Sequence, residues 1–417
     1  MAPALDVLGV RTVAVAAPPS RDLLDLLPET GALAWVRAGE GIVGWGELVR
    51  LSLRGPDAFA RAEAWWRTVV TGAEVADEVL LPGSGLVAFG SFAFDGGASG
   101  SPASSVLVVP RVIVGHRGGT WWRTTVGSPG GEATLRGAPR PPGQITWSDG
   151  ARTGPEWADV VAAAVRRIEA GEVAKVVLAR DVTASIAAPL DLRWPLRRLA
   201  TSYPDCCTFA VDGLLGATPE ILVRLRDGVA SSRVLAGTLR RTGDANRDAR
   251  QGTAFAGSVK DLEEHGYGVS SVVDALAVHC GGDVRVPAAP FVLELPNVMH
   301  LATDVSGRVV DSSTSLGLLA SLHPSAAVCG TPTRDALEVI REVEGLDRGR
   351  YAGPVGWLDA SGDGEWGIAL RCAEVDAEDP TRLRLFAGCG IVAGSRPRDE
   401  LAESEAKLVP MRDALRG

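Results

Sequence analysis

Two short segments of the sequence each carry a pair of acidic side chains at helical spacing. In DELAESEAKL, residues 399–408, Glu400 and Glu403 are three residues apart, and Lys407 follows on the same helical face. In KDLEEH, residues 260–265, Asp261 and Glu264 repeat that spacing. Two carboxylates about 4 Å apart repel by on the order of 4 kcal/mol at a surface-like dielectric. Each pair is therefore either well solvated or neutralised by a cation.

The acidic pairs have a plain interpretation and a chemical one. Charged side chains usually lie outside, so an isolated pair is most simply a solvated surface patch. Two pairs on helices with apolar opposite faces favour an alternative, in which four carboxylates meet in one cleft around Mg²⁺, which takes oxygen ligands. A histidine–cysteine metal site is not indicated, because the five His are dispersed and the six Cys form no CxxC pair.

Other positions also have side chains or backbone suited to binding or proton transfer. Lys175 begins the β-rich run KVVLAR and is either a sheet-edge residue or a partly desolvated amine. Glu220 lies in a turn between two strands, where an exposed carboxylate is the simplest interpretation. Arg371 either clamps a carboxylate or forms a salt bridge at the rim. Gly388 and Gly390 either admit a ligand close to the backbone or mark a β-bulge.

The elements that must position these residues follow from the periodicity of the apolar residues. We expect helices at 57–70, 155–171, 260–279 and 399–408, and strands at 11–17, 85–94, 104–115, 120–127, 175–186, 365–375 and 383–391. Within 212–225 we expect a strand, a turn and a second strand. The strand at 365–375 is expected to be continuous, because its apolar residues alternate strictly. A Gly- and Pro-rich loop at 127–144 separates an N-terminal part, 1–150, from the remainder, 151–417.

Composition narrows the class of protein. The chain has 417 residues, of which 46% are hydrophobic and 22% charged, as in a globular protein with a large core. Its net charge of −9 and its lack of a basic, aromatic stretch argue against nucleic acid as a partner. No charge-free run reaches the ~20 apolar residues of a membrane span, and the N-terminus has no basic signal-peptide region. We therefore expect a cytoplasmic protein with reduced cysteines and no membrane contact.

In their order along the chain, a series of segments resembles the chorismate-utilising enzymes, the family of isochorismate, anthranilate, aminodeoxychorismate and salicylate synthases. The resemblance extends from about Glu156 to Leu408 and rests on KVVLAR, GATPEIL, LAGTLRR, SVKDLEEH, NVMHL, LHPSAAVCGTP, RGRYAGPVGW, WGIALRCA, AGCGIVAGSRP and ELAESEAKL. It implies an α+β (α/β sandwich) fold of large, mostly antiparallel sheets flanked by helices. Residues 1–417 are then one domain, in which 1–150 complete the sandwich and 151–417 form the chorismate-binding catalytic region.

The same resemblance implies a role for each candidate residue. Glu264 and Glu403 match the family's Mg²⁺ ligands, with Asp261 and Glu400 as outer neighbours. Lys175 matches the base that activates water for attack at C2 of the ring, and Glu220 matches the acid that protonates the departing C4 hydroxyl. Lys175 must then be neutral, and Glu220 must stay protonated through a raised pKa. The positions that match substrate-binding residues are Gly237, Thr238, His300, Tyr351, Arg371, Gly388, Gly390 and Lys407.

One position distinguishes among the branches of the family. Ala327, in HPSAAVCGTP, stands where anthranilate- and salicylate-forming members usually have Thr and aminodeoxychorismate synthases usually have Ser. Alanine there resembles the isochorismate synthases, which implies conversion of chorismate to isochorismate for menaquinone or siderophore biosynthesis. The sequence has no glutaminase-like segment, so we expect no glutaminase partner, and the resemblance to a family that is often monomeric implies a monomer. A salicylate synthase or an aminating synthase remains the alternative, and a non-catalytic Mg²⁺-dependent binding protein is a third interpretation.

The acidic pairs generate the first prediction, an absolute need for Mg²⁺. EDTA should abolish turnover of chorismate and added Mg²⁺ should restore it, because the carboxylates need a cation. Glu264→Ala and Glu403→Ala should each remove activity and leave the fold intact, as judged by circular dichroism. Full activity in EDTA would exclude the metal.

Overall fold

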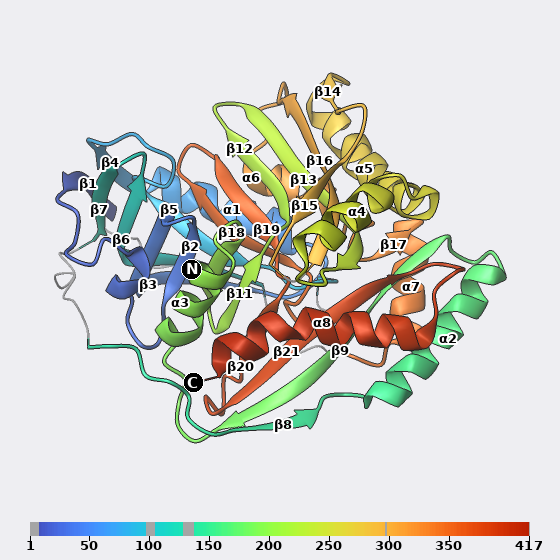
Figure 1. Ribbon diagram of the computed structural model, residues 1–417. Helices are drawn as coiled ribbons and strands as arrows, with labels where there is room; N and C mark the ends of the chain where they lie inside the picture. Colours follow the sequence, from blue (N-terminus) through green and yellow to red (C-terminus); the bar gives the residue numbers. More distant parts are fainter. Residues whose placement is uncertain (1–7, 97–104, 128–136, 297, 417) are drawn as a thin grey trace.

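The computed structural model describes residues 8–96, 105–127, 137–296 and 298–416, apart from the side chains of Ala236, Thr238, Lys260 and Glu264 (Figure 1). The helices are η1 Leu23–Leu26, α1 Ala58–Thr71, α2 Gly154–Glu169, α3 Arg193–Ser202, α4 Ala245–Ala256, α5 Val259–His279, α6 Ser315–Leu322, α7 Thr333–Val343 and α8 Pro397–Leu415. The strands of the N-terminal part are β1 Leu8–Val15, β2 Leu33–Arg37, β3 Glu40–Leu53, β4 Ala73–Asp77, β5 Val87–Ser91, β6 Ser105–Arg117, β7 Thr120–Val126 and β8 Ile145–Asp149. The later strands are β9 Lys175–Ile186, β10 Cys207–Val211, β11 Leu214–Thr218, β12 Ile221–Arg226, β13 Val229–Arg240, β14 Val284–Arg285, β15 Phe291–Glu294, β16 Val298–Arg308, β17 Gly330–Thr331, β18 Pro354–Asp359, β19 Gly364–Ile368, β20 Cys372–Val375 and β21 Arg382–Ile391.

The strands form two branches that diverge from the long pairing of β3 with β6. One branch continues from β6 through β5, β18, β19, β12 and β13 to β16. The other continues from β3 through β2, β10, β11, β20 and β21 to β9. Across the described residues these pairings link a 21-stranded sheet, in which β1 and β4 are the one parallel pair. The expected sandwich of large, mostly antiparallel sheets is confirmed.

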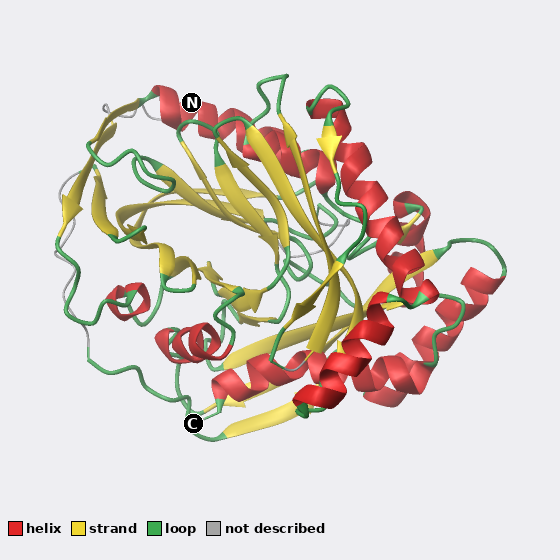
Figure 2. Ribbon diagram, turned by 45° about the horizontal axis from the view of Figure 1, so that its top comes forward, coloured by secondary structure: helices red, strands yellow, loops and turns green. Residues whose placement is uncertain are grey.

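Helices cover the outside of both branches, as Figure 2 shows with helices in red and strands in yellow. Helices α2, α7 and α8 pack on the branch that ends in β21 and β9, and α5 and α6 pack on the branch that contains β12, β13 and β16. Large side chains fill the interior, among them the fully buried Trp122, Trp157, Trp357 and Trp366. Over the part of the chain that is described, no helix is long and apolar enough to cross a membrane.

Local sequence explains why the helix expected at 155–171 forms. Thr153 and Glu156 make a reciprocal capping box at the start of α2, with a proline in its first turn. Trp157 lies on the buried face of the helix. Gly171 follows its end with a φ of 80°, a conformation that glycine adopts without strain. Helix α2 and the neighbouring strand β9 both appear where the sequence predicts them.

The prediction of one continuous strand at 365–375 is wrong. Strand β19 ends at Ile368 and β20 begins at Cys372, and the two strands pair with different neighbours. The interruption contains Arg371, whose φ of 49° lies in the left-handed region, which breaks strand geometry. This break turns the Arg371 side chain into a cavity instead of onto a sheet face.

Candidate active site

A cavity of about 180 Å³ opens where the ends of the two branches meet helices α5 and α8. Every predicted site residue with a described side chain, and each predicted glycine, lines it: Lys175, Glu220, Gly237, Asp261, His300, Ala327, Tyr351, Arg371, Gly388, Gly390, Glu400, Glu403 and Lys407. The side chains of Thr238 and Glu264 lie outside the described part of the structure. Residues as far apart in the chain as Lys175 and Lys407 therefore share a single site.

Pairing of β9 with β21 builds one wall of the cavity. Gly388 lies opposite Ala179 and Gly390 lies opposite Val177, and Lys175 begins β9. A Cβ atom on Gly388 would lie 2.8 Å from the carbonyl oxygen of Leu178 and 3.0 Å from the Tyr351 hydroxyl. Only glycine fits this position without a shift of its neighbours.

The Tyr351 ring is held flat against this wall. It stacks on Phe386, with ring centroids 5.1 Å apart and planes at 9°. Burial raises the pKa of the Tyr351 hydroxyl, so this group remains a neutral hydrogen-bond donor at the cavity surface.

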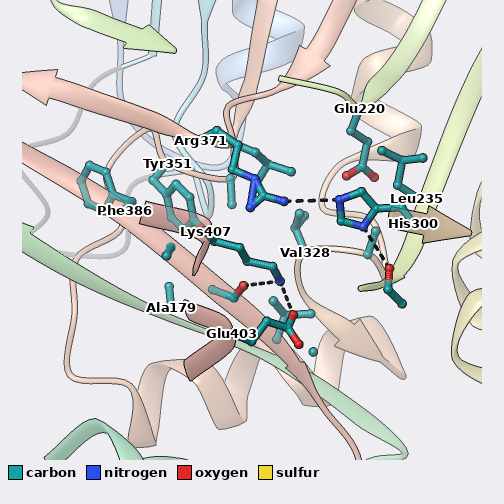
Figure 3. Close-up of a pocket in the computed structure, with 18 of the residues that line it drawn as sticks. Ala179, Glu220, Leu235, His300, Val328, Tyr351, Arg371, Phe386, Glu403 and Lys407 are labelled. Carbon is teal, nitrogen blue, oxygen red and sulfur yellow. Dashed lines mark hydrogen bonds and ion pairs between the residues drawn. The ribbon is translucent and has the colours of Figure 1, made fainter. Parts of the chain in front are cut away.

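Lys407 relieves part of the carboxylate crowding on α8 (Figure 3). Its Nζ lies 2.6 Å from Glu403 Oε1 and donates a hydrogen bond of 2.8 Å to the carbonyl oxygen of Gly388. Burial opposes ionisation of Glu403, but the adjacent Lys407 ammonium holds the pKa of this carboxyl below its ordinary value. The helix face is thus a mixed-charge surface, in which Lys407 also ties α8 to β21.

His300 and Arg371 form a hydrogen-bonded pair across the cavity, visible in Figure 3. The Nδ1 of His300 donates to the carbonyl oxygen of Gly237 at 2.9 Å, and its Nε2 accepts from Arg371 Nη2 at 3.4 Å. Burial and the Arg371 charge lower the pKa of His300 to about 3. His300, whose role the sequence leaves open, is therefore a neutral group that orients Arg371 and the backbone at Gly237, where the pairing of β13 with β16 shifts its register.

Glu220 lies at the crossing point between β11 of one branch and β12 of the other. The residue is buried, and its backbone N–H donates to the Thr218 hydroxyl at 3.3 Å. Burial raises the pKa of the Glu220 carboxyl to about 8, although Lys175, Arg371 and Lys407 oppose the shift. The carboxyl therefore holds a proton at neutral pH. Lys175 is buried in the same cavity at the start of β9, which fits the interpretation of a desolvated amine.

The carboxylates of the cavity fit a hard divalent cation. Asp261, Glu400 and Glu403 present oxygen ligands to the same space, and Glu400 and Glu403 have ligand atoms within 4.8 Å of one another and of the Cys389 sulfur. Burial raises the pKa of the Cys389 thiol well above its ordinary value, which leaves a protonated sulfur. Since Mg²⁺ prefers oxygen and avoids thiol sulfur, the oxygen donors alone match it.

One charged residue of the cavity wall was not predicted. Arg348 lines the cavity but is buried and paired with Glu344. The four-residue spacing between these two side chains is visible in the sequence. Burial of such a pair depends on tertiary packing, so the spacing alone did not distinguish it from a surface salt bridge.

The raised pKa of Glu220 predicts a pH-dependent contribution to stability. The folded protein keeps a proton that an unfolded glutamate loses above its ordinary pKa of 4.5, so this contribution is present at low pH and is lost as pH rises toward about 8. Relative to Glu220→Gln, the wild-type free energy of unfolding should fall by about 1.4 kcal/mol per pH unit between about pH 5.5 and about pH 7.5. Urea unfolding of both proteins measures this. A difference that does not change with pH would show that Glu220 is ionised in the fold.

Comparison with known proteins places this cavity in a known family. The chorismate binding enzyme family model matches residues 133–416. The salicylate biosynthesis isochorismate synthase of Pseudomonas aeruginosa is 36% identical, over 97% of this chain and 90% of that protein. The isochorismate synthase DhbC of Bacillus subtilis is 40% identical, over 60% of this chain and 65% of that protein.

Solved structures agree with the sequence relatives. A putative 2,3-dihydroxybenzoate-specific isochorismate synthase, DhbC from Bacillus anthracis, superposes with a TM-score of 0.78 at 30% identity, over 94% of this chain and 98% of that chain. The menaquinone-specific MenF of Escherichia coli shares the fold, with a TM-score of 0.80 at 23% identity, over 99% of this chain and 96% of that chain. The likeness to isochorismate synthases that the motifs indicate is confirmed, and the chain belongs to the chorismate binding enzyme family.

Proposed function

We propose that this protein is an isochorismate synthase, which converts chorismate to isochorismate. The observation that carries the proposal is a buried, protonated carboxyl at Glu220 in the same cavity as the buried amine of Lys175. An acid and a base from two different elements match a reaction that adds a hydroxyl at one ring carbon and removes a hydroxyl from another. The names of the sequence relatives support the same reaction.

In the proposed mechanism, the amine of Lys175 accepts a proton from the water that attacks C2 of the ring. The electron pairs of the ring shift, the C4–oxygen bond breaks, and the Glu220 carboxyl donates its proton to that oxygen, which leaves as water. One water enters and one leaves, so chorismate and isochorismate are isomers. The raised pKa of Glu220 makes it a competent donor near neutral pH.

Substrate charge is the other requirement of the site. Chorismate carries two carboxylates, and the cavity presents the guanidinium of Arg371 and the ammonium of Lys407. The His300 contact orients the Arg371 fork toward a planar carboxylate, as bidentate binding requires. Glu403 and Glu400, with Asp261 and Glu264, would hold Mg²⁺, which when bound supplies positive charge to a substrate carboxylate. These residues allow a protein of net charge −9 to bind a dianion.

The cavity wall near Ala327 favours attack of water on the ring over two competing reactions, the loss of pyruvate and the attack of ammonia. Ala327 and Val328 present apolar side chains to the cavity, and neither has a hydroxyl that can hold an intermediate for loss of pyruvate. The relatives include enzymes named for salicylate biosynthesis, for vibriobactin and for menaquinone. We therefore assign isochorismate as the released product, and a salicylate synthase or an aminating synthase is the second candidate.

Acid–base catalysis predicts a loss of turnover in two variants. The wild type, incubated with chorismate and Mg²⁺, should yield isochorismate as identified by chromatography. Lys175→Ala and Glu220→Gln should each lower kcat by about 10²-fold or more, while chorismate affinity changes much less. If either variant raised KM and left kcat unchanged, that residue would bind substrate and not transfer protons. Absence of any chorismate turnover by the wild type would overturn the proposed function.

Ala327 predicts how the products divide. Ala327→Thr introduces a hydroxyl beside the reacting ring, and one hydrogen bond of about 1 kcal/mol changes partitioning several-fold. The variant should convert part of the isochorismate to salicylate and pyruvate, whereas the wild type should form little salicylate near neutral pH. Products are quantified at equal chorismate consumption. Abundant salicylate from the wild type would identify a salicylate synthase, and identical product ratios would remove Ala327 as the determinant.

A further inference from the structure

Strand β9 has an edge without a strand neighbour beside the cavity, within the described residues. One edge of β9 pairs with β21 from Val176 to Ser185. Along its other edge, β17 pairs only with Lys175 and Val176, and β8 pairs only from Val182 onward. The backbone groups in between need other partners, because an unpaired buried N–H or C=O group is costly.

Buried side chains and one loop supply those partners. Arg348 Nη2 donates to the Val177 carbonyl oxygen at 2.7 Å, and Glu344 Oε2 accepts from the Ala179 N–H at 2.7 Å. The Val177 N–H donates to the Cys329 carbonyl oxygen at 2.8 Å. These contacts take the place of a missing strand over the residues that follow Lys175.

Arg348 and Glu344 form one rigid unit. Nε and Nη2 of Arg348 lie 2.7 and 2.6 Å from the two carboxylate oxygens of Glu344. Their side chains are 3% and 1% exposed, and the guanidinium lies 4.1 Å from the centre of the Phe94 ring. A bidentate pair of this kind fixes orientation as well as distance.

The same guanidinium also holds the loop that contains Ala327 and Val328. Arg348 Nη1 donates to the carbonyl oxygen of Val328 at 3.0 Å. Val328 adjoins Ala327 in the loop that lines the cavity. One side chain therefore connects the strand of Lys175 to the loop of Ala327.

We propose that the Arg348–Glu344 pair is a positioning device that holds the strand bearing the general base at a fixed separation from the loop bearing Ala327. This inference rests on the proposed function. Arg348 lines the cavity, but its hydrogen bonds to Glu344, Val177 and Val328 direct the guanidinium to protein groups, so it acts through its neighbours. Small displacements of a catalytic group are enough to reduce turnover strongly.

The test separates positioning from ordinary stabilisation by removing both charges together. The double variant Arg348→Met/Glu344→Gln leaves no lone buried charge, so it should remain folded. It lacks the guanidinium bonds to Val177 and Val328. Arg193 and Asp191 provide a matched control, because their ion pair is also 3% and 1% exposed and neither residue lines the cavity. The control variant is Arg193→Met/Asp191→Asn.

Kinetics are measured at a temperature at which circular dichroism shows all proteins folded. The Arg348/Glu344 variant should lose about 10²-fold in kcat with little change in KM for chorismate. Arg348→Lys should not restore kcat, because an ammonium lacks the planar fork. The control should retain kcat within about twofold. A kcat near the wild-type value in the first variant, or an equal loss in the control, would overturn the proposal.

Hydrogen exchange gives a readout that does not depend on chorismate turnover. Peptides that cover 175–181 and 325–330 should exchange faster in the Arg348/Glu344 variant than in the wild type. In that variant, helix α3, which begins at Arg193, should exchange at the wild-type rate. Unchanged exchange in both peptides would refute the positioning role even if the wild type proves inactive. An inactive wild type with the expected exchange would instead refute only the proposed reaction.

Discussion

Burial of charge is the constraint on which this structure depends. The cavity brings ionisable side chains together, many of them buried, and an unpaired buried ion costs several kcal/mol. Three of these groups meet this cost in different ways: Glu403 pairs with Lys407, His300 is neutral, and Glu220 keeps its proton. For Glu220, the response to burial also suits the group for catalysis, because a buried carboxyl that stays protonated can act as a general acid.

The two-branched sheet makes this arrangement possible. Branches that diverge from β3 and β6 leave a space between their far ends, and β21, β9 and β16 carry site residues into it. Helix α8 then places Glu403 and Lys407 against β21 through the Gly388 carbonyl oxygen. The residues that we propose to bind substrate charge and those that we propose to transfer protons thus come from different elements, which allows their environments to differ.

Local sequence was sufficient for elements whose determinants are local. The Thr153 cap, Pro155 and Gly171 delimit α2, and the β-rich run KVVLARDVTASI marks β9. It failed at Arg371, because an alternating pattern continues across a residue with positive φ and gives no sign of the break. The burial and charge surroundings of the site residues also could not be predicted from the local sequence. Glu220 looks like an exposed turn carboxylate in its own segment, and it is buried only because two branches enclose that turn. Family resemblance identified the residue, but not the packing that tunes it.

The central claim is that base and acid act on two different oxygens, so that water becomes the C2 hydroxyl and the C4 hydroxyl departs. Turnover of chorismate in water enriched in oxygen-18 tests this most directly, with the product analysed by mass spectrometry after a small fraction of substrate is consumed. The account predicts isochorismate that carries one oxygen-18 atom, located on C2. Isochorismate without the label would show that the original hydroxyl migrates within the ring, and it would contradict the assigned roles of Lys175 and Glu220.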